Sequence, residues 1–192
     1  MPNELTQEQS QKLIEYANSF DTERNKRWVS VSHKLAAFDH FIVVTAQGLG
    51  KLDSKLLKED EMLVQQRSTS NPFGDMSDHI TMSYLWVLGT YEIIRSLDQR
   101  AKDDANFLPE IKERLQQLKW RFERLRIPLA KFEAAKKHSE TDSHIAYPGI
   151  NVELGIAWQV SEDTWITRRE LSDSMLELLE DIKSMGADSI DD

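Results

Sequence analysis

The sequence predicts an all-α protein, a bundle of five or six helices with a small β-hairpin before the C-terminal helix. Apolar residues recur at alternating spacings of three and four over most of the chain, which is the period of helices that bury one face. Only 7 glycines and 5 prolines occur among 192 residues, roughly half the usual ~12%. The hydrophobic fraction of 40% is sufficient for one core, so we expect a single domain over residues 1–192.

Three helices are predicted before residue 68. Thr6 is a good N-cap for a short first helix with an apolar stripe of Leu13, Ala17 and Phe20. A longer helix follows Asp21, and its stripe is Trp28, Val31, Leu35, Phe38, Ile42, Thr45 and Leu49. Gly48 and Gly50 are predicted to end it, because glycine readily adopts the left-handed cap conformation. Residues 51–67 then form a more polar helix with Leu52, Leu56 and Leu63 facing inward.

The next helix is predicted to be the core helix of the bundle. The loop before it is 68–75, where Ser, Asn, Pro and Gly are concentrated. Ser77 or Asp78 can cap the helix, which runs to about Arg100. Its apolar residues cover much of its circumference, as expected for a central helix. They are Ile80, Tyr84, Leu85, Trp86, Val87, Leu88, Tyr91, Ile94 and Leu97.

Residues 108–138 carry the most regular pattern in the chain. Their heptad stripe is Leu108, Ile111, Leu115, Leu118, Phe122, Leu125, Leu129 and Phe132. This spacing suits near-parallel packing of helices. Pro128 lies within it and predicts a kink or a restart near Ile127, with the continued register favouring a kink.

The C-terminal part is predicted to form a hairpin and a last helix. Residues 139–156 read as irregular, and 157–160 (AWQV) and 164–167 (TWIT) as two short strands. Thr167 and Glu170 have the spacing of a capping box. The helix that follows has the stripe Leu171, Met175, Leu178, Ile182 and Met185. It stops at Gly186, before a frayed acidic tail at 187–192.

Composition excludes several classes of protein and site. There is no cysteine, which excludes disulfides, thiolate metal sites and cysteine nucleophiles and fits a reducing compartment. The net charge of −9, a polar start and a longest apolar run of about five residues indicate a soluble, cytoplasmic protein that does not enter membranes. Phosphate-loop, H-E-x-x-H, G-x-S-x-G and Glu-x-x-His motifs are all missing. We therefore predict no cofactor and no metal, and interpret His138, Asp142 and His144 as a solvated loop.

Glu92 and Arg95 stand out because they are charged residues within the apolar core helix. Three residues apart, they can meet on one face, and a charge buried without a partner costs several kcal/mol. We interpret them as a polar clamp between helices, joined by Tyr91 or Arg100, and exposure of both side chains to solvent is a further reading. The alternative is a pocket in which Tyr91, Glu92 and Arg95 bind a small ligand.

Two regions of opposite charge predict an interface. Residues 112–137 hold nine basic and three acidic residues, whereas 162–192 hold ten acidic and three basic ones. Such regions most simply dock on each other, within the chain or across a dimer. The candidate residues are Arg114, Lys119, Arg121, Arg124 and Arg126 on one side and Glu177, Glu180 and Asp181 on the other.

Arg27 and His33 provide the basis for an RNA-cleaving alternative. Their R-x5-H spacing is similar to the short Arg…His motif of the HEPN helical ribonucleases, in which the pair acts on the RNA phosphodiester. The resemblance covers these two residues, and Trp28 stands where that family usually has a polar residue. No family is assigned from it. Nucleic-acid binding would use this pair or the cations Lys119, Arg121, Arg124 and Arg126.

The leading functional hypothesis is a non-enzymatic helical interaction or assembly protein, either a homodimer or a subunit of a larger complex. It rests on the heptad stripe, the complementary charges and the missing catalytic motifs. A nucleic-acid-binding or RNA-cleaving protein and a small-ligand sensor are the alternatives.

Overall fold

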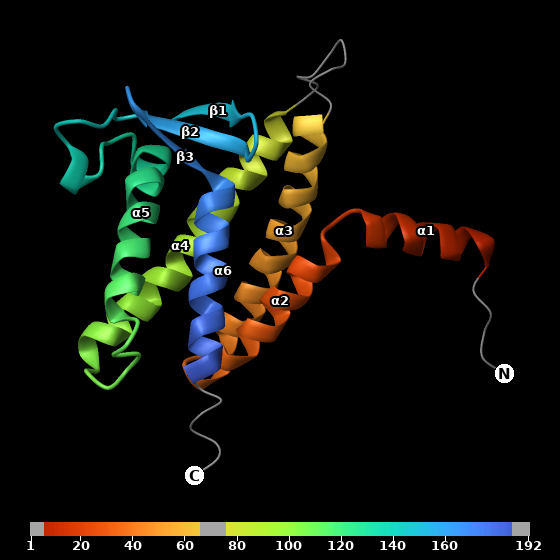
Figure 1. Cartoon of the computed structure of the whole chain (residues 1–192), viewed down its shortest axis with the longest axis horizontal. Coiled ribbons are helices and arrows are strands. Elements are labelled where there is room, and N and C mark those ends of the chain that lie inside the picture. Colours follow the sequence, from red (N-terminus) through yellow and green to blue (C-terminus); the bar gives the residue numbers. More distant parts are fainter. Residues whose placement is uncertain (1–5, 66–75, 186–192) are drawn as a thin grey trace.

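The structure, a computed structural model, describes residues 6–65 and 76–185, and it confirms the predicted helical bundle. Five helices form a closed ring in which each contacts the next and the last returns to the first (Figure 1). These are α2 (Thr22–Ser32), α3 (His40–Gln65), α4 (Ser77–Asp103), α5 (Lys112–Lys131) and α6 (Arg168–Met185). The predicted loop 68–75, the helix stop at Gly186 and the acidic tail 187–192 lie outside the described residues.

Three of the predicted helix caps form and one does not. Thr6 caps α1 (Gln7–Asn18) in a capping box, and the Asp21 carboxylate accepts the backbone N–H of Arg24 at the start of α2. Thr167 and Glu170 also form their predicted capping box before α6. The N-cap of α4, however, is Met76, without a side-chain cap, so the predicted cap at Ser77 or Asp78 is wrong.

The predicted helix end at Gly48 and Gly50 is also wrong, because α3 continues through both glycines. The chain breaks earlier instead: α2 ends at Ser32, a 3-10 turn η1 spans His33–Ala37, and α3 begins at His40. Gly50 has a packing role, since a Cβ there would lie 2.3 Å from the Cβ of Trp28. The glycine thus lets α2 approach α3 closely.

The heptad stripe is buried over most of its length by the chain itself. Ile111, Leu115, Leu118, Phe122 and Leu125 are buried, and Leu108 and Leu129 pack partly against the core. Phe132 is an exception: it ends α5 in the left-handed conformation and its side chain is 66% exposed. The helix continues through Pro128 without a restart.

The hairpin is present and gains a third strand. The antiparallel sheet has the order β1 (Tyr147–Asn151), β2 (Gly155–Ser161) and β3 (Thr164–Thr167). The segment around Pro148, which the sequence predicts to be irregular, pairs as an edge strand, where a proline is tolerated. Ile156, Trp158 and Val160 of β2 are buried, and β2 contacts α3, α5 and α6.

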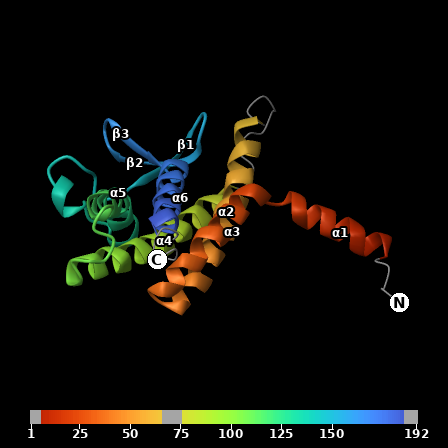
Figure 2. The same ribbon diagram turned by 60° about the horizontal axis from the view of Figure 1, so that its bottom comes forward.

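Helix α1 contributes no buried residue and extends away from the bundle in both views (Figure 1 and Figure 2). The core therefore lies between the five other helices and the sheet. No helix within residues 6–65 and 76–185 is both long and apolar enough to cross a membrane.

Candidate functional site

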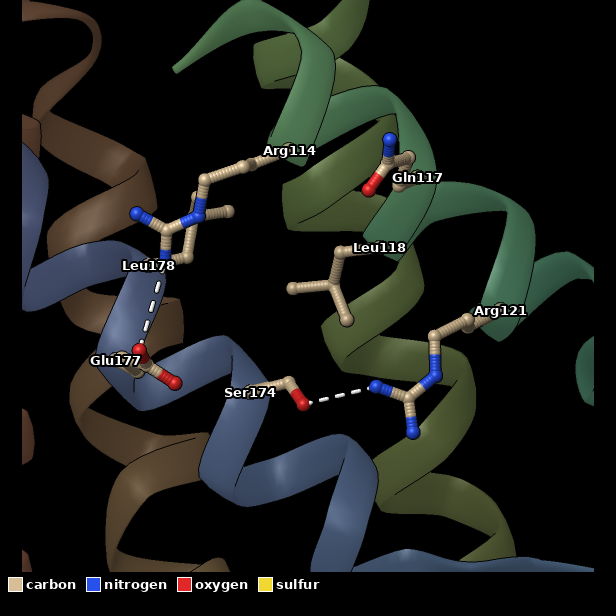
Figure 3. Close-up of a pocket in the computed structure, with 7 residues that line it drawn as sticks. All are labelled: Arg114, Gln117, Leu118, Arg121, Ser174, Glu177 and Leu178. Carbon is tan, nitrogen blue, oxygen red and sulfur yellow. Dashed lines mark hydrogen bonds and ion pairs between the residues drawn. The ribbon is translucent and has the colours of Figure 1, made fainter.

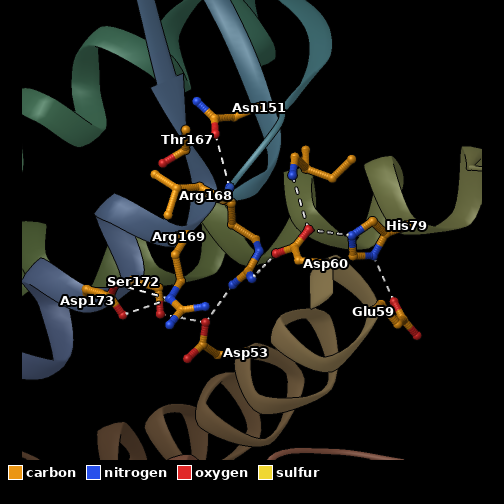
Figure 4. Close-up of polar contacts among 12 residues, drawn as sticks. Asp53, Glu59, Asp60, His79, Asn151, Thr167, Arg168, Arg169, Ser172 and Asp173 are labelled. Atoms are coloured by element: carbon orange, nitrogen blue, oxygen red, sulfur yellow. Dashed lines mark hydrogen bonds and ion pairs between the residues drawn. The ribbon is translucent and has the colours of Figure 1, made fainter. Parts of the chain in front are cut away.

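A charge network inside the bundle connects α2, α3 and α6, and Figure 4 shows its α3 and α6 residues. Arg168, the first residue of α6, is fully buried and donates to Asp53 Oδ1 at 2.6 Å and to Asp60 Oδ2 at 2.5 Å. Asp53 also accepts hydrogen bonds from Arg24 Nε at 2.5 Å and from Trp28 Nε1 at 2.9 Å. Two arginines and two aspartates thus join three helices.

Serine and backbone donors add to this network. The hydroxyl of Ser172 donates to Asp53 Oδ1 at 2.5 Å, and Arg24 also contacts Ser172 Oγ. The backbone N–H of Ile156, at the start of β2, donates to Asp60 Oδ1 at 3.1 Å. The sheet is therefore connected to the same carboxylate as α6.

Both aspartates are held ionised. Burial by itself raises the pKa of Asp53, but the charges of Arg168 and Arg24 outweigh it and bring the pKa below its usual value. Burial likewise raises the pKa of Asp60, and its hydrogen bonds from His79 and Arg168 reverse the direction, so this pKa is also lowered. The network consequently consists of charged partners.

His79 extends the network toward α4. Its Nδ1 lies 2.7 Å from Glu59 Oε2, and its Nε2 lies 2.8 Å from Asp60 Oδ1. Each of these contacts is a hydrogen bond only where a proton lies between the two atoms. The ring is nearly buried and connects α4 to the C-terminal half of α3.

Sequence reasoning missed this network, although one signal was present. Ala46, Gly50, Asp53, Leu57 and Asp60 follow the alternating spacing of four and three, and all are buried. Two carboxylates in such a register indicate buried charges that need cationic partners. The network can orient α6 and the sheet against α3. We assign it that structural role, because its central groups are buried against one another.

The predicted clamp at Glu92 and Arg95 is wrong. Arg95 Nε donates to Glu92 Oε2 at 2.7 Å, but each side chain is 51% exposed, so the pair lies on the surface of α4. The hydrogen bond to Glu92 raises the pKa of Arg95. Tyr91 faces the bundle instead, where its hydroxyl donates to Glu123 at 3.1 Å. The three residues therefore line no common pocket.

The predicted charged interface forms in part, between α5 and α6 (Figure 3). Arg114 contacts Asp181 at 2.5 Å and Glu177 at 3.6 Å, and Arg121 donates to Ser174 Oγ at 3.0 Å. These side chains surround an open hollow of about 170 Å³ whose floor includes Leu118 and Leu178. Arg114 therefore docks on the acidic helix of its own chain.

The other cations of α5 face different elements. Lys119 contacts Asp98 of α4 at 2.8 Å. Arg124 holds Asp142 at 2.7 Å, and Arg126 stacks 5.0 Å from the ring centre of Tyr91. Because these contacts lie within the chain, the basic residues of α5 do not form one continuous free surface for a nucleic acid.

The two residues of the HEPN-like spacing, Arg27 and His33, have different surroundings. Arg27 forms two hydrogen bonds to Glu180 of α6, at 2.8 and 2.9 Å, and this contact lowers the pKa of Glu180. His33 is exposed where α2 ends, and it is the first residue of η1.

Asp142, one of the residues considered for a metal site, forms an ion pair with Arg124. The described part of the chain contains no group of three or more side chains suited to a metal ion.

Several apolar residues of α1 and α3 are left exposed by the bundle. We call this surface the α1–α3 face and define it by Leu13, Tyr16, Phe20, Phe41, Val44, Gly48 and Leu52. Phe41 is 83% exposed and Val44 71% exposed. Farther along α3, Gly48 and Leu52 line an open hollow of about 440 Å³ with Tyr16 and Phe20.

The sequence does not reveal this face, because its pattern places Leu13, Phe20 and Leu52 on buried stripes and predicts a helix end at Gly48. Its signal is the spacing of Phe41, Val44, Gly48 and Leu52, which lie on one side of a helix.

No protein-family model matches the chain, and neither a curated protein nor a solved structure was found to match it.

Proposed function

We propose that this protein is a non-enzymatic interaction module that binds a protein partner, a second copy or another chain, through the α1–α3 face. The observation that carries the proposal is the exposure of Phe41 and Val44 on α3, together with the hollow that α3 lines with α1, a projecting helix without a buried residue. A group of large apolar side chains left exposed on the surface is typical of interaction sites.

The arrangement of polar groups also supports an interaction role. The charged residues inside the bundle are engaged with one another, as Arg168 is with Asp53 and Asp60. The hollow between α5 and α6 is lined by the ion-paired side chains of Arg114 and Glu177 and by the apolar side chains of Leu118 and Leu178. The absence of cysteine from the sequence supports a reducing compartment, and we propose the cytoplasm as the place of action.

Photocrosslinking in the cells that make the protein tests this proposal. The photoreactive residue benzoylphenylalanine is placed at Phe41, and a matched variant carries it at Phe132, which is also an exposed aromatic residue. Irradiation is expected to join position 41 to a protein, either the same chain or another one, and to give much less product at position 132. Equal products at both positions, or none at position 41, would refute a role for this face.

A further inference from the structure

We infer that the α1–α3 face binds a second copy of the chain, with two α3 helices packed antiparallel about a two-fold axis beside residues 46 and 47. This inference rests on the proposed function and names the partner. A two-fold interface must be self-complementary, so a protrusion and a matching hollow have to occur on the same surface.

The α1–α3 face has both parts. Phe41 protrudes with 83% of its surface exposed, and the apolar hollow lies beside Gly48 and Leu52. Phe41 precedes Gly48 by seven residues and Leu52 by eleven residues on the same helix, which is about 10 to 16 Å at 1.5 Å per residue. Phe41 therefore cannot fill the hollow of its own chain, whereas the same residue of a second copy can.

The register follows from placing Phe41 opposite Leu52. In an antiparallel pair related by a two-fold axis, the two residue numbers at each facing position then add to 93. Thr45 consequently faces Gly48 of the second copy, and both are small. Small residues at the crossing point allow two helices to approach closely. All four residues project from the same side of α3.

Gly48 is the second, independent observation. A Cβ on Gly48 would meet no atom within 4 Å, so nothing in the monomer requires a glycine there. Glycine inside a helix is nevertheless less stable than alanine by about 1 kcal/mol. A close helix from a second copy explains why an unfavourable residue occupies an exposed position in the middle of α3. By contrast, Gly50 on the same helix is explained by Trp28 of its own chain.

The area available is sufficient for a specific dimer. Phe41, Val44, Leu13 and Tyr16 are each half or more exposed and offer on the order of 100 Å² apiece. Together with Thr45, Gly48 and the aliphatic stems of Lys51 and Lys55, two copies would bury roughly 1,000 Å². That value is near the lower limit for a specific protein–protein interface.

Sedimentation equilibrium of the purified chain, from low to high micromolar concentration, measures the association. We expect a dimer whose dissociation constant rises at least about tenfold in Phe41→Ser and in Gly48→Gln. Phe132→Ser, the matched loss of an exposed aromatic ring, is expected to leave the constant unchanged. Gly48→Gln is also expected to keep the helical circular dichroism spectrum, since the side chain enters open space in the monomer.

Crosslinking then tests the register, and the cysteine-free sequence makes single cysteines unambiguous. In the proposed dimer the two Thr45 residues lie about 10 Å apart, whereas the two Lys58 residues lie about 35 Å apart. A short bismaleimide should therefore join Thr45→Cys chains and leave Lys58→Cys chains monomeric. Crosslinking at Lys58 in place of Thr45 would overturn this packing.

The failure of this inference can be told apart from the failure of the proposed function. A purified chain that remains monomeric at high micromolar concentration, or variants that associate like the wild type, would overturn the second copy as partner. Photocrosslinking from Phe41 to a different protein in cells, combined with such a result, would overturn this inference and retain the proposed function.

Discussion

Replacement of Arg168 by methionine tests the account of the buried network most directly. Methionine retains an unbranched apolar stem but has no charge, so Asp53 and Asp60 would lose the guanidinium that both contact. The two carboxylates and Arg168 have at most 3% of their side-chain surface exposed, and water therefore cannot replace the lost partner. Removal of one member of a buried ion pair costs about 3–5 kcal/mol.

Urea denaturation followed by tryptophan fluorescence measures this loss, because Trp28 and Trp86 are buried and contact the same network. For a chain of this size, 3–5 kcal/mol corresponds to a fall in melting temperature of roughly 6–20 °C. Arg169→Met is the matched control, since the neighbouring arginine pairs with Asp173 at the surface. We expect it to cost less than about 1 kcal/mol.

The pH dependence of this difference provides the decisive check. In Arg168→Met the buried carboxylates can bind protons, which lowers the free-energy cost of burying them without a cationic partner. The difference in the free energy of unfolding between the wild type and the variant should therefore become smaller as the pH falls from 7 toward 4. A loss below about 1 kcal/mol at pH 7, equal to that of the control, would refute the reasoning. A gap independent of pH would show that lost packing, not unpaired charge, is responsible.

Three further outcomes are expected. Gly50→Ala should destabilise the protein by about 1–3 kcal/mol in urea denaturation, because its Cβ would overlap Trp28; an unchanged midpoint would contradict this close approach. The lowered pKa values of Asp53 and Asp60 stabilise the folded state above their unfolded value of 3.8, and this stabilisation is lost as the pH falls through the folded values. The free energy of unfolding should therefore decrease below about pH 4, and a rise there would show that the sign is wrong. Arg95→Met should change stability by less than about 1 kcal/mol, since the ion pair is half-exposed; thermal unfolding would reveal a larger loss if the residue were a buried clamp.

The helices were predictable where local signals agree. Thr6, Asp21 and Thr167 cap their helices because a side-chain oxygen can reach a backbone N–H within one turn. The stripe of α5 was likewise visible, since Leu115, Leu118 and similar residues repeat at the helical period. Capping and periodicity act over a few residues and therefore require no knowledge of the rest of the chain.

The errors occurred where one residue type serves several purposes. The sequence predicts a helix end at Gly50, but this glycine allows Trp28 to approach α3 closely. The need for glycine at this position therefore depends on another helix, α2. Glu92 was read as buried because its sequence neighbours are apolar. The helix rotates successive residues by about 100°, which places Glu92 on the exposed side while Tyr91 and Ile93 are buried.

The candidate site shows the same division. The charges of α5 and the C-terminal region indicated mutual docking, and Arg114 does contact Asp181. The ion pairs of Lys119 with Asp98 and of Arg124 with Asp142 were not predictable from the sequence, since charge alone does not select among several carboxylates.

The amino-acid sequence alone determined the helical class, the capped starts of α1, α2 and α6 and the position of the hairpin, because hydrogen bonds and side-chain periodicity within each segment decide them. The tertiary structure alone decided which faces are covered. Asp53 and Arg168 lie 115 residues apart and meet only when α3 and α6 pack, and Phe41 is left exposed by that same packing. Burial is a property of the assembled helices, so a single helical period cannot specify it.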